Sequence, residues 1–336
     1  MIYVQVRMRS YVIFLLLSAA ACAQVPTPPL SGDDALRITE FYRLAAQIQD
    51  KVWPYWSATP APLLLLTAEA EFLTHDSAVP KDFRKVGEDF YERPRQFPIS
   101  LQATFPAFGP PSVIVIGEPE STDSKTSTPW LFTLMHEHFH QLQDEQPGLE
   151  KQTENLGLSH GDTSGMWMLN YPFPYEKPEL ERAFSNLRDL LLRALNENDA
   201  REFARLAREY VRKREEFFAQ LPSDDRKYFS FQLWKEGVAR YVQIKSAEAA
   251  AQYQPTARYA ALPDFESFAA YAAHARKDTL DELKQADLAK WKRVVVYSFG
   301  AGECLLLDRL NPKWKNQYFK TMLSTDSYFR TSSKHP

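Results

Sequence analysis

The chain has 336 residues, and its 40 Lys and Arg against 43 Asp and Glu give a net charge of −3 at pH 7. This mild acidity excludes the basic surplus with which nucleic-acid-binding proteins neutralise phosphates, so no nucleic-acid partner is predicted. The two cysteines of the whole sequence exclude a disulfide framework. Glycine is scarce, with 11 residues, and long segments rich in Ala, Leu, Glu and Arg indicate a helix-rich protein.

The first 23 residues have the pattern of a secretory signal peptide. Arg7 and Arg9 form a positive head, residues 11–17 form a short apolar run, and small residues follow. The pattern predicts export to the periplasm or the extracellular space, because the run is too short to remain as a membrane span. Two processing routes stay open: cleavage after Ala23, or lipidation of Cys22, which would attach the protein to a membrane.

A Pro-rich tether is predicted over 24–32, followed by a helix over 33–53 that Pro54 ends. Apolar or alternating segments then predict three strands, at residues 63–72, 99–105 and 112–117. Together they predict an N-terminal subdomain over 33–125, made of one helix and a small mixed sheet.

The next helix has a clear start and a clear core-facing side. The hydroxyl residues before Pro129 are typical of a helix N-terminus. Leu131, Met135, His138 and Leu142 recur at helical spacing and predict the side that faces the core. His138 is therefore expected to pack in the core with one hydrogen bond.

The same helix carries the motif His136-Glu137-x-x-His140. Residues four apart lie on one helix face, so the two imidazoles can bind one metal ion. This spacing predicts the zinc-hydrolase arrangement, with one zinc ion and Glu137 as general base. A strand with alternate histidines on one face, as in amidohydrolase barrels or cupins, would need β-rich surroundings, whereas the flanking residues indicate helix.

Two histidines bind zinc poorly without a third protein ligand, and two acidic residues are candidates. Asp162 lies in a predicted irregular segment, 148–178. Glu236 lies on a predicted helix over 223–253 and has apolar neighbours, so its carboxylate needs a partner. Gly237 beside it would let two helices approach closely. The competing interpretation is an ordinary surface pair between Glu236 and Arg240, one turn away.

Helices dominate the rest of the chain. The fold class predicted is α+β, with a small mixed sheet followed by a mainly helical domain over 126–325. Further helices are predicted over 178–221, as a pair, and over 263–284 and 288–310.

In three segments the chain resembles the gluzincins, particularly the peptidase-MA-like group. The His-Glu-x-x-His segment with Gln143 is similar to the metal helix of that group. Residues 236–241 are similar to its Glu-Gly-x-Ala helix, and Tyr297-x-x-Gly300 is similar to a downstream segment of several members. The resemblance implies a zincin-like fold with zinc held by His136, His140 and Glu236.

The function predicted is an exported zinc metallopeptidase that cleaves a peptide or protein substrate. Glu137 would take a proton from the attacking water and pass it to the leaving amine. Tyr297 is the first candidate for the oxyanion donor, and His160 is the second. The alternative is a catalytically silent exported module that binds a metal and recognises a peptide or a cell-envelope component; the intact Glu137 favours the enzyme.

Overall fold

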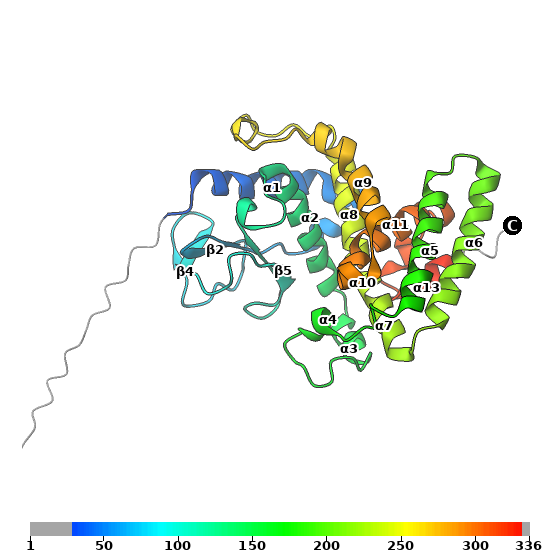
Figure 1. The fold of residues 1–336 in the computed structure, drawn as a ribbon. Helices are drawn as coiled ribbons and strands as arrows, with labels where there is room; N and C mark the ends of the chain where they lie inside the picture. Colours follow the sequence, from blue (N-terminus) through cyan, green and yellow to red (C-terminus); the bar gives the residue numbers. More distant parts are fainter. Residues whose placement is uncertain (1–28, 331–336) are drawn as a thin grey trace, which may run out of the picture.

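The computed structural model describes residues 29–330. The predicted signal peptide and Cys22 lie outside these residues. Figure 1 shows the strands at one end of the molecule and the helices α5 and α6 at the other. A sheet followed by a mainly helical region confirms the coarser part of the fold prediction. Within the described residues, no helix has both the length and the apolar composition needed to cross a membrane.

The first helix, α1 (Gly32–Val52), begins at a capped N-terminus. The Ser31 hydroxyl accepts a hydrogen bond from the Asp34 backbone N–H at 3.0 Å, which satisfies a donor that would otherwise be free. Ile38, Phe41 and Ile48 are among the residues that α1 buries in the main core. The helix packs on α2 (Ser127–Asp144) and α8 (Val238–Ala249).

The sheet has six strands in the order β3-β4-β2-β1-β6-β5. The central strands β1 (Leu63–Leu66) and β6 (Val113–Gly117) are parallel, and the other neighbours are antiparallel. Alternate residues of both central strands enter two separate apolar clusters, so each strand is covered on both faces. The outer strands are β2 (Ala70–Thr74), β3 (Arg84–Lys85), β4 (Phe90–Pro94) and β5 (Gln102–Phe105).

The prediction of one strand over 63–72 is wrong, because the segment is a hairpin. Thr67 closes the turn: its N–H donates to the Ala70 carbonyl at 2.9 Å, and its hydroxyl accepts from the Ala70 N–H at 3.2 Å. The chain therefore reverses after Leu66. The short strands β3 and β4 were not predicted, because their charged residues gave no alternating apolar pattern.

The central helix of the fold is α2 (Ser127–Asp144). Every residue from Trp130 to Gln143 is buried, because strands β5 and β6 of the sheet and the helices α1, α8 and α9 (Phe268–Gln285) all pack against α2. A helix buried all round is a rigid position for functional side chains. The predicted histidine motif lies in its second half.

The remaining helices extend the helical part of the molecule away from the sheet, with α9 and α11 packed on α8, and α5 and α6 packed on each other. The bounds are α3 (Leu149–Glu154), α4 (Trp167–Asn170), α5 (Pro178–Asn196), α6 (Ala200–Ala219), α7 (Ser223–Gln232), α8 (Val238–Ala249), α9 (Phe268–Gln285), α10 (Leu288–Trp291), α11 (Val295–Leu310), α12 (Lys315–Tyr318) and α13 (Asp326–Arg330). The main core includes residues from α1, from one face of the sheet and from these helices. It therefore extends across the boundary predicted at residue 125.

Two of the predicted long helices are interrupted. A π-helical turn, η3 (Leu233–Gly237), separates α7 from α8 within the segment predicted as 223–253. The segment predicted as 288–310 breaks at Lys292, whose φ of 48° ends α10 before α11 begins. The prediction of 263–284 was too long at its start, because Ser267 caps α9.

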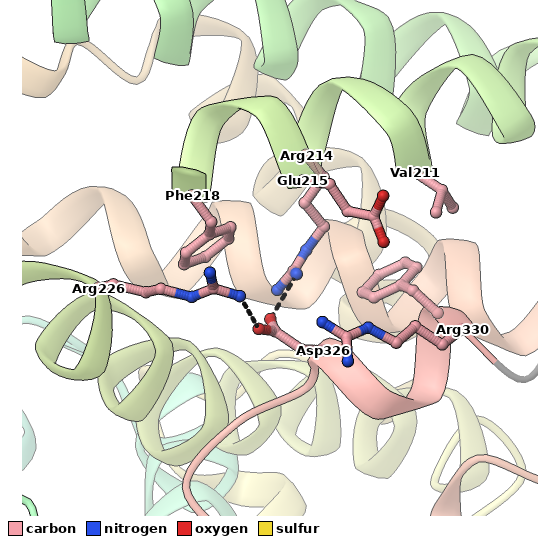
Figure 2. Close-up of a pocket in the computed structure, with 8 residues that line it drawn as sticks. Val211, Arg214, Glu215, Phe218, Arg226, Asp326 and Arg330 are labelled. Atoms are coloured by element: carbon pink, nitrogen blue, oxygen red, sulfur yellow. Dashed lines mark hydrogen bonds and ion pairs between the residues drawn. The ribbon is translucent and has the colours of Figure 1, made fainter. Parts of the chain in front are cut away.

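A buried ionic network connects α6, α11 and the C-terminal helix. Arg214 donates from Nε to Glu303 at 2.6 Å and from Nη1 to Asp326 at 2.6 Å. Tyr210 donates to the same Glu303 carboxylate at 2.6 Å. Figure 2 shows Arg214 and Arg226 meeting at Asp326. Both carboxylate oxygens of Asp326 accept from an arginine, and most donors of Arg214 have partners. The network therefore fixes α13 against α6 and α11 and leaves no buried charge in it unpaired.

A second cluster of charges joins the end of β6 to the starts of α1 and α2. Arg37 donates to Asp34 at 2.7 Å and to the Ser127 hydroxyl at 2.8 Å. Burial, the charges of Asp34 and Glu120, and a hydrogen bond to Asp34 raise the pKa of Glu118 to about 7. Glu118 is therefore a proton-binding position in the folded state.

Glu118 is expected to make the free energy of unfolding depend on pH. The pKa of Glu118 is about 7 in the folded protein and about 4.3 in the unfolded chain. The proton bound by Glu118 therefore contributes its full stabilisation of the folded state at pH values below the unfolded pKa. That stability is lost as the pH rises through 7. Glu118→Gln should raise the melting temperature by a few degrees at pH 8 and leave it unchanged at pH 4. Equal differences from the wild type at both pH values would contradict this assignment.

Candidate metal centre

Three predicted ligands meet at one point between α2 and η3. The Glu236 Oε2 atom lies 3.2 Å from His140 Nε2 and 3.7 Å from His136 Nε2. The two Nε2 atoms are 3.1 Å apart. Among the described residues, these three form the one group of His, Cys, Asp and Glu that could hold a metal ion, with ligand atoms within 4.8 Å of one another.

This group fits a zinc ion in its donor types and in its spacing. Two imidazole nitrogens and one carboxylate oxygen are donors that zinc accepts. Bonds of about 2.0–2.2 Å from one tetrahedral ion place its ligand atoms a little over 3 Å apart, which matches the separations of 3.1 and 3.2 Å. Three protein ligands would leave a fourth position for water or substrate.

Gln143 connects the two elements that carry the ligands. Its Oε1 lies 2.6 Å from His140 Nδ1, and its Nε2 donates to the Lys235 carbonyl at 3.0 Å and to the Tyr318 hydroxyl at 2.6 Å. Since the Gln143 amide nitrogen donates to these oxygens, its Oε1 accepts from His140 Nδ1–H. The Nε2 lone pair of His140 is then free for a metal.

We expect Gln143→Leu to lower zinc affinity about 10- to 100-fold, because His140 would lose its orientation and tautomer. Competition with a chromophoric chelator measures the change. Gln146→Ala is the matched control, since its side chain donates only to Leu142 in its own turn among the described contacts. Wild-type affinity in Gln143→Leu would remove this glutamine from the site.

The π-helical turn determines where the Glu236 side chain points. A π turn carries one more residue than an α turn, so it changes the helix face on which later residues lie. Glu236 points to the histidines, whereas Arg240 donates to Glu282 of α9 at 2.8 Å and to Gln243 at 3.0 Å. The competing prediction of a Glu236–Arg240 surface pair is therefore wrong.

Two glycines bring the η3 turn against α11. A Cβ atom placed on Gly237 would lie 2.6 Å from the Gly300 Cα, and one on Gly300 would lie 2.5 Å from the Gly237 Cα. Real Cβ atoms do not approach backbone so closely, and both contacts are with backbone, which cannot rotate away. The predicted close approach at Gly237 is confirmed, and Gly300 is its partner.

Glu137 lies beside the three ligands and is held by the edge strand of the sheet. The Thr104 hydroxyl of β5 is 2.8 Å from Glu137 Oε2 and 3.0 Å from the Glu137 carbonyl oxygen. The carboxylate is 4% exposed. Its charge acts on both histidines and on Tyr297, which places it next to the same centre.

Tyr297 lies near His136, at the start of α11. Its ring centroid is 6.1 Å from that of His136, and the Arg293 guanidinium lies over its ring at 5.4 Å. Burial and the charge of Glu236 raise the pKa of Tyr297 above its usual value. The phenol therefore keeps its proton and can donate a hydrogen bond.

Burial and the contacts among the three ligands shift the pKa of each ligand. Burial lowers the pKa of His136. Burial acts to lower the pKa of His140 as well, but the charge and hydrogen bond of Glu236 outweigh it and raise the value. Burial acts to raise the pKa of Glu236, yet the two histidines hold it well below the usual range. Glu236 is therefore a carboxylate, as a metal ligand must be.

Three other predicted residues lie away from this centre. The rival ligand Asp162 binds its own loop, with Ser164 N–H at 2.7 Å and Trp167 N–H at 2.7 Å. His160 is exposed, and its charge acts on Asp224 of α7. His138 packs in the core as predicted, although it has two hydrogen-bond partners, Gln49 and Gln141, where one was expected.

Sequence reasoning missed Thr104 and Arg293, and it used Gln143 only for the resemblance. Nothing in the local pattern of Thr104 or Arg293 indicates a site, because each reaches the centre through tertiary packing.

Comparison of the chain with protein-family models, with curated proteins and with solved structures gives no match.

Proposed function

We propose that the protein is an exported zinc-dependent peptidase with a zincin-like arrangement of its site. The observation that carries the proposal is the meeting of His136, His140 and Glu236, with Glu137 alongside. The ligands come from helices far apart in the sequence, and a metal ion would satisfy the partly buried Glu236 carboxylate and the two imidazoles together. Export and the processing of Cys22 remain predictions from the sequence.

The residues around the centre have complementary chemical roles. Zinc bound there would supply Lewis acidity towards a water molecule and a substrate carbonyl. Glu137 accepts the proton of the attacking water and delivers it to the leaving amine, while Thr104 fixes the direction of its carboxylate. Tyr297 donates a hydrogen bond to the oxygen on which negative charge develops.

The sheet edge offers a place for an extended peptide. β5 is an edge strand, and the Thr104 of this strand contacts the proposed base directly. Edge strands present unpaired backbone N–H and C=O groups, and extended peptides bind such edges by adding a strand. A peptide on β5 would therefore pass beside Glu137, which favours an amide bond as the reacting group.

The test combines metal content with a cleavage profile. Zinc stoichiometry is measured after purification and after reconstitution, and the loaded protein is incubated with a peptide library whose products are identified by mass spectrometry. We expect one zinc per chain and cleavage that a chelator stops and zinc restores. Zinc binding without cleavage of any library member would favour the silent binding module.

We expect Tyr297→Phe to lower turnover about 10²- to 10³-fold while zinc affinity stays constant, because one donor to the oxyanion is lost with little change in volume. Steady-state kcat and a metal titration check the two parts. His160→Ala is the companion variant and should leave kcat unchanged. Unchanged turnover in Tyr297→Phe with reduced turnover in His160→Ala would reverse the two assignments.

A further inference from the structure

Arg293 is a partly exposed arginine whose guanidinium has different partners from those of the more buried Arg37, Arg93 and Arg214. It precedes Tyr297 by one helical turn, and its side chain is 21% exposed. Its Nη1 donates to Gln232 Oε1 at 3.4 Å and lies 3.9 Å from Glu236 Oε1. The phenol of Tyr297 is its third polar neighbour. None of these is a short bond to a carboxylate.

Three other arginines show what a satisfied guanidinium looks like in this protein. Arg37, Arg93 and Arg214 each have at least two nitrogen atoms within 3.0 Å of oxygen atoms, and each has at least one carboxylate among these partners. Buried guanidinium groups are normally paired in this way, because an unpaired charge is costly to bury. Most of the five N–H donors of Arg293 therefore have no hydrogen-bond acceptor among the described contacts.

The position of Arg293 limits what that partner can be. The Glu236 Oε2 atom faces the histidines, and Oε1 faces Arg293, so the guanidinium lies directly beyond the metal ligand. An extended peptide residue spans about 3.3–3.6 Å. If a substrate carbonyl lies at the metal, the group that binds Arg293 is therefore one or two residues along the same peptide. The planar fork of arginine matches a carboxylate with two parallel hydrogen bonds.

We infer that Arg293 binds the free C-terminal carboxylate of the substrate, so that the protein removes one or two residues from the C-terminus of a peptide. This inference rests on the proposed peptidase function and gives it a substrate class. Arg293 is a specificity-determining residue in this arrangement, whereas Glu137 and Tyr297 act on the reacting atoms.

The surroundings of Arg293 favour an apolar C-terminal side chain. Gln232 links it to α4, because its Nε2 donates to the Met168 carbonyl at 2.7 Å while its Oε1 accepts from Arg293. Met166 and Leu169 of that segment are exposed apolar residues, at 48% and 49%. The test peptides therefore carry apolar residues at the C-terminus.

The experiment compares two forms of one peptide. N-acetylated tetrapeptides with two apolar residues at the C-terminus are made as the free acid and as the amide. The zinc-loaded wild type should cleave the free acid with a kcat/KM at least about 30-fold above that of the amide, as expected for loss of one partner of a desolvated charge pair. Mass spectrometry should show release of a single amino acid or a dipeptide.

Variants of Arg293 show whether this residue causes the preference. Arg293→Gln should lower the ratio of kcat/KM for the free acid to kcat/KM for the amide to about 1, because the partner that distinguishes the two peptides is lost. Arg293→Lys, which keeps the charge and loses the fork, should give an intermediate ratio. Arg188→Gln is the matched control, because that arginine donates to Asp189 and to the Ala286 carbonyl and, among the described contacts, to no residue of the metal centre; it should keep the wild-type ratio.

Binding is measured separately from hydrolysis. Calorimetry of Glu137→Gln with the same two peptides should give a lower Kd for the acid, and the double variant with Arg293→Gln should bind both equally. Equal kcat/KM for acid and amide in the wild type would overturn the inference and leave the peptidase proposal intact. An acid preference that persists in Arg293→Gln would overturn the assignment to Arg293. Tighter binding of the acid by Glu137→Gln, with no hydrolysis of either peptide by the zinc-loaded wild type, would leave Arg293 as a carboxylate-binding residue but overturn the removal of residues together with the peptidase proposal.

Discussion

Glu137→Gln is expected to keep its zinc and to lose hydrolysis. The substitution preserves size and removes the basic oxygen, so the loss should be that of a general base, about 10²- to 10⁴-fold in kcat. The Thr104 hydroxyl can still donate its one hydrogen to the new amide oxygen or to the backbone carbonyl of the same residue, which keeps the fold of the region. Single-turnover assays and metal analysis of the same sample measure both quantities.

Thr104→Val is the companion variant for this experiment. It removes the hydrogen bond that directs Glu137 and leaves the base itself, so its effect on kcat should be smaller than that of Glu137→Gln. A zinc content in Glu137→Gln as low as in His136→Ala would mean that Glu137 is a ligand, and the proposed mechanism would then be wrong.

Glu236→Gln is expected to remove zinc binding almost completely. An amide is a poor zinc ligand, and two histidines alone hold the ion weakly. The loss should therefore exceed the roughly 100-fold that changes to supporting residues produce. In the wild type, saturation with zinc at 100 times Kd should stabilise the native state by about 2.7 kcal/mol. The variant should show no zinc-dependent change in melting temperature.

Asp162→Asn is the matched control, since it makes the same change from acid to amide at the rival ligand. It should keep wild-type zinc affinity, because the Asp162 carboxylate binds Ser164 and Trp167 of its own loop. If Asp162→Asn lost zinc and Glu236→Gln kept it, Asp162 would be the third ligand. The prediction of a gluzincin-like site would then be wrong.

The features that sequence could predict were those encoded by local spacing. His136 and His140 lie four apart, so their common face followed from helix geometry alone. Glu236 was identified because apolar residues surround it, and Leu233 and Trp234 are indeed fully buried. The order of a small sheet before a helical region followed from the same kind of pattern.

The features that sequence could not predict depend on contacts between distant segments. The hydroxyl of Thr104 reaches Glu137 from an edge strand, and Gly300 becomes informative only when its contact with Gly237 is known. The pairing of Arg240 with Glu282 required the position of α9. Charged residues in β3 and β4 hid strands that are defined by their neighbours rather than by their own composition.

The π-helical turn makes the centre sensitive to the length of the chain as well as to its composition. Each residue of an α-helix rotates the next side chain by about 100°, so deleting one residue between Leu233 and Gly237 would let the turn relax to α geometry and point the carboxylate elsewhere. The gene could thus lose the third ligand through one in-frame codon deletion that leaves Glu236, His136 and His140 all in place. A variant of this kind would still carry every residue of the motif, and a search by motif alone would not detect that its centre is broken.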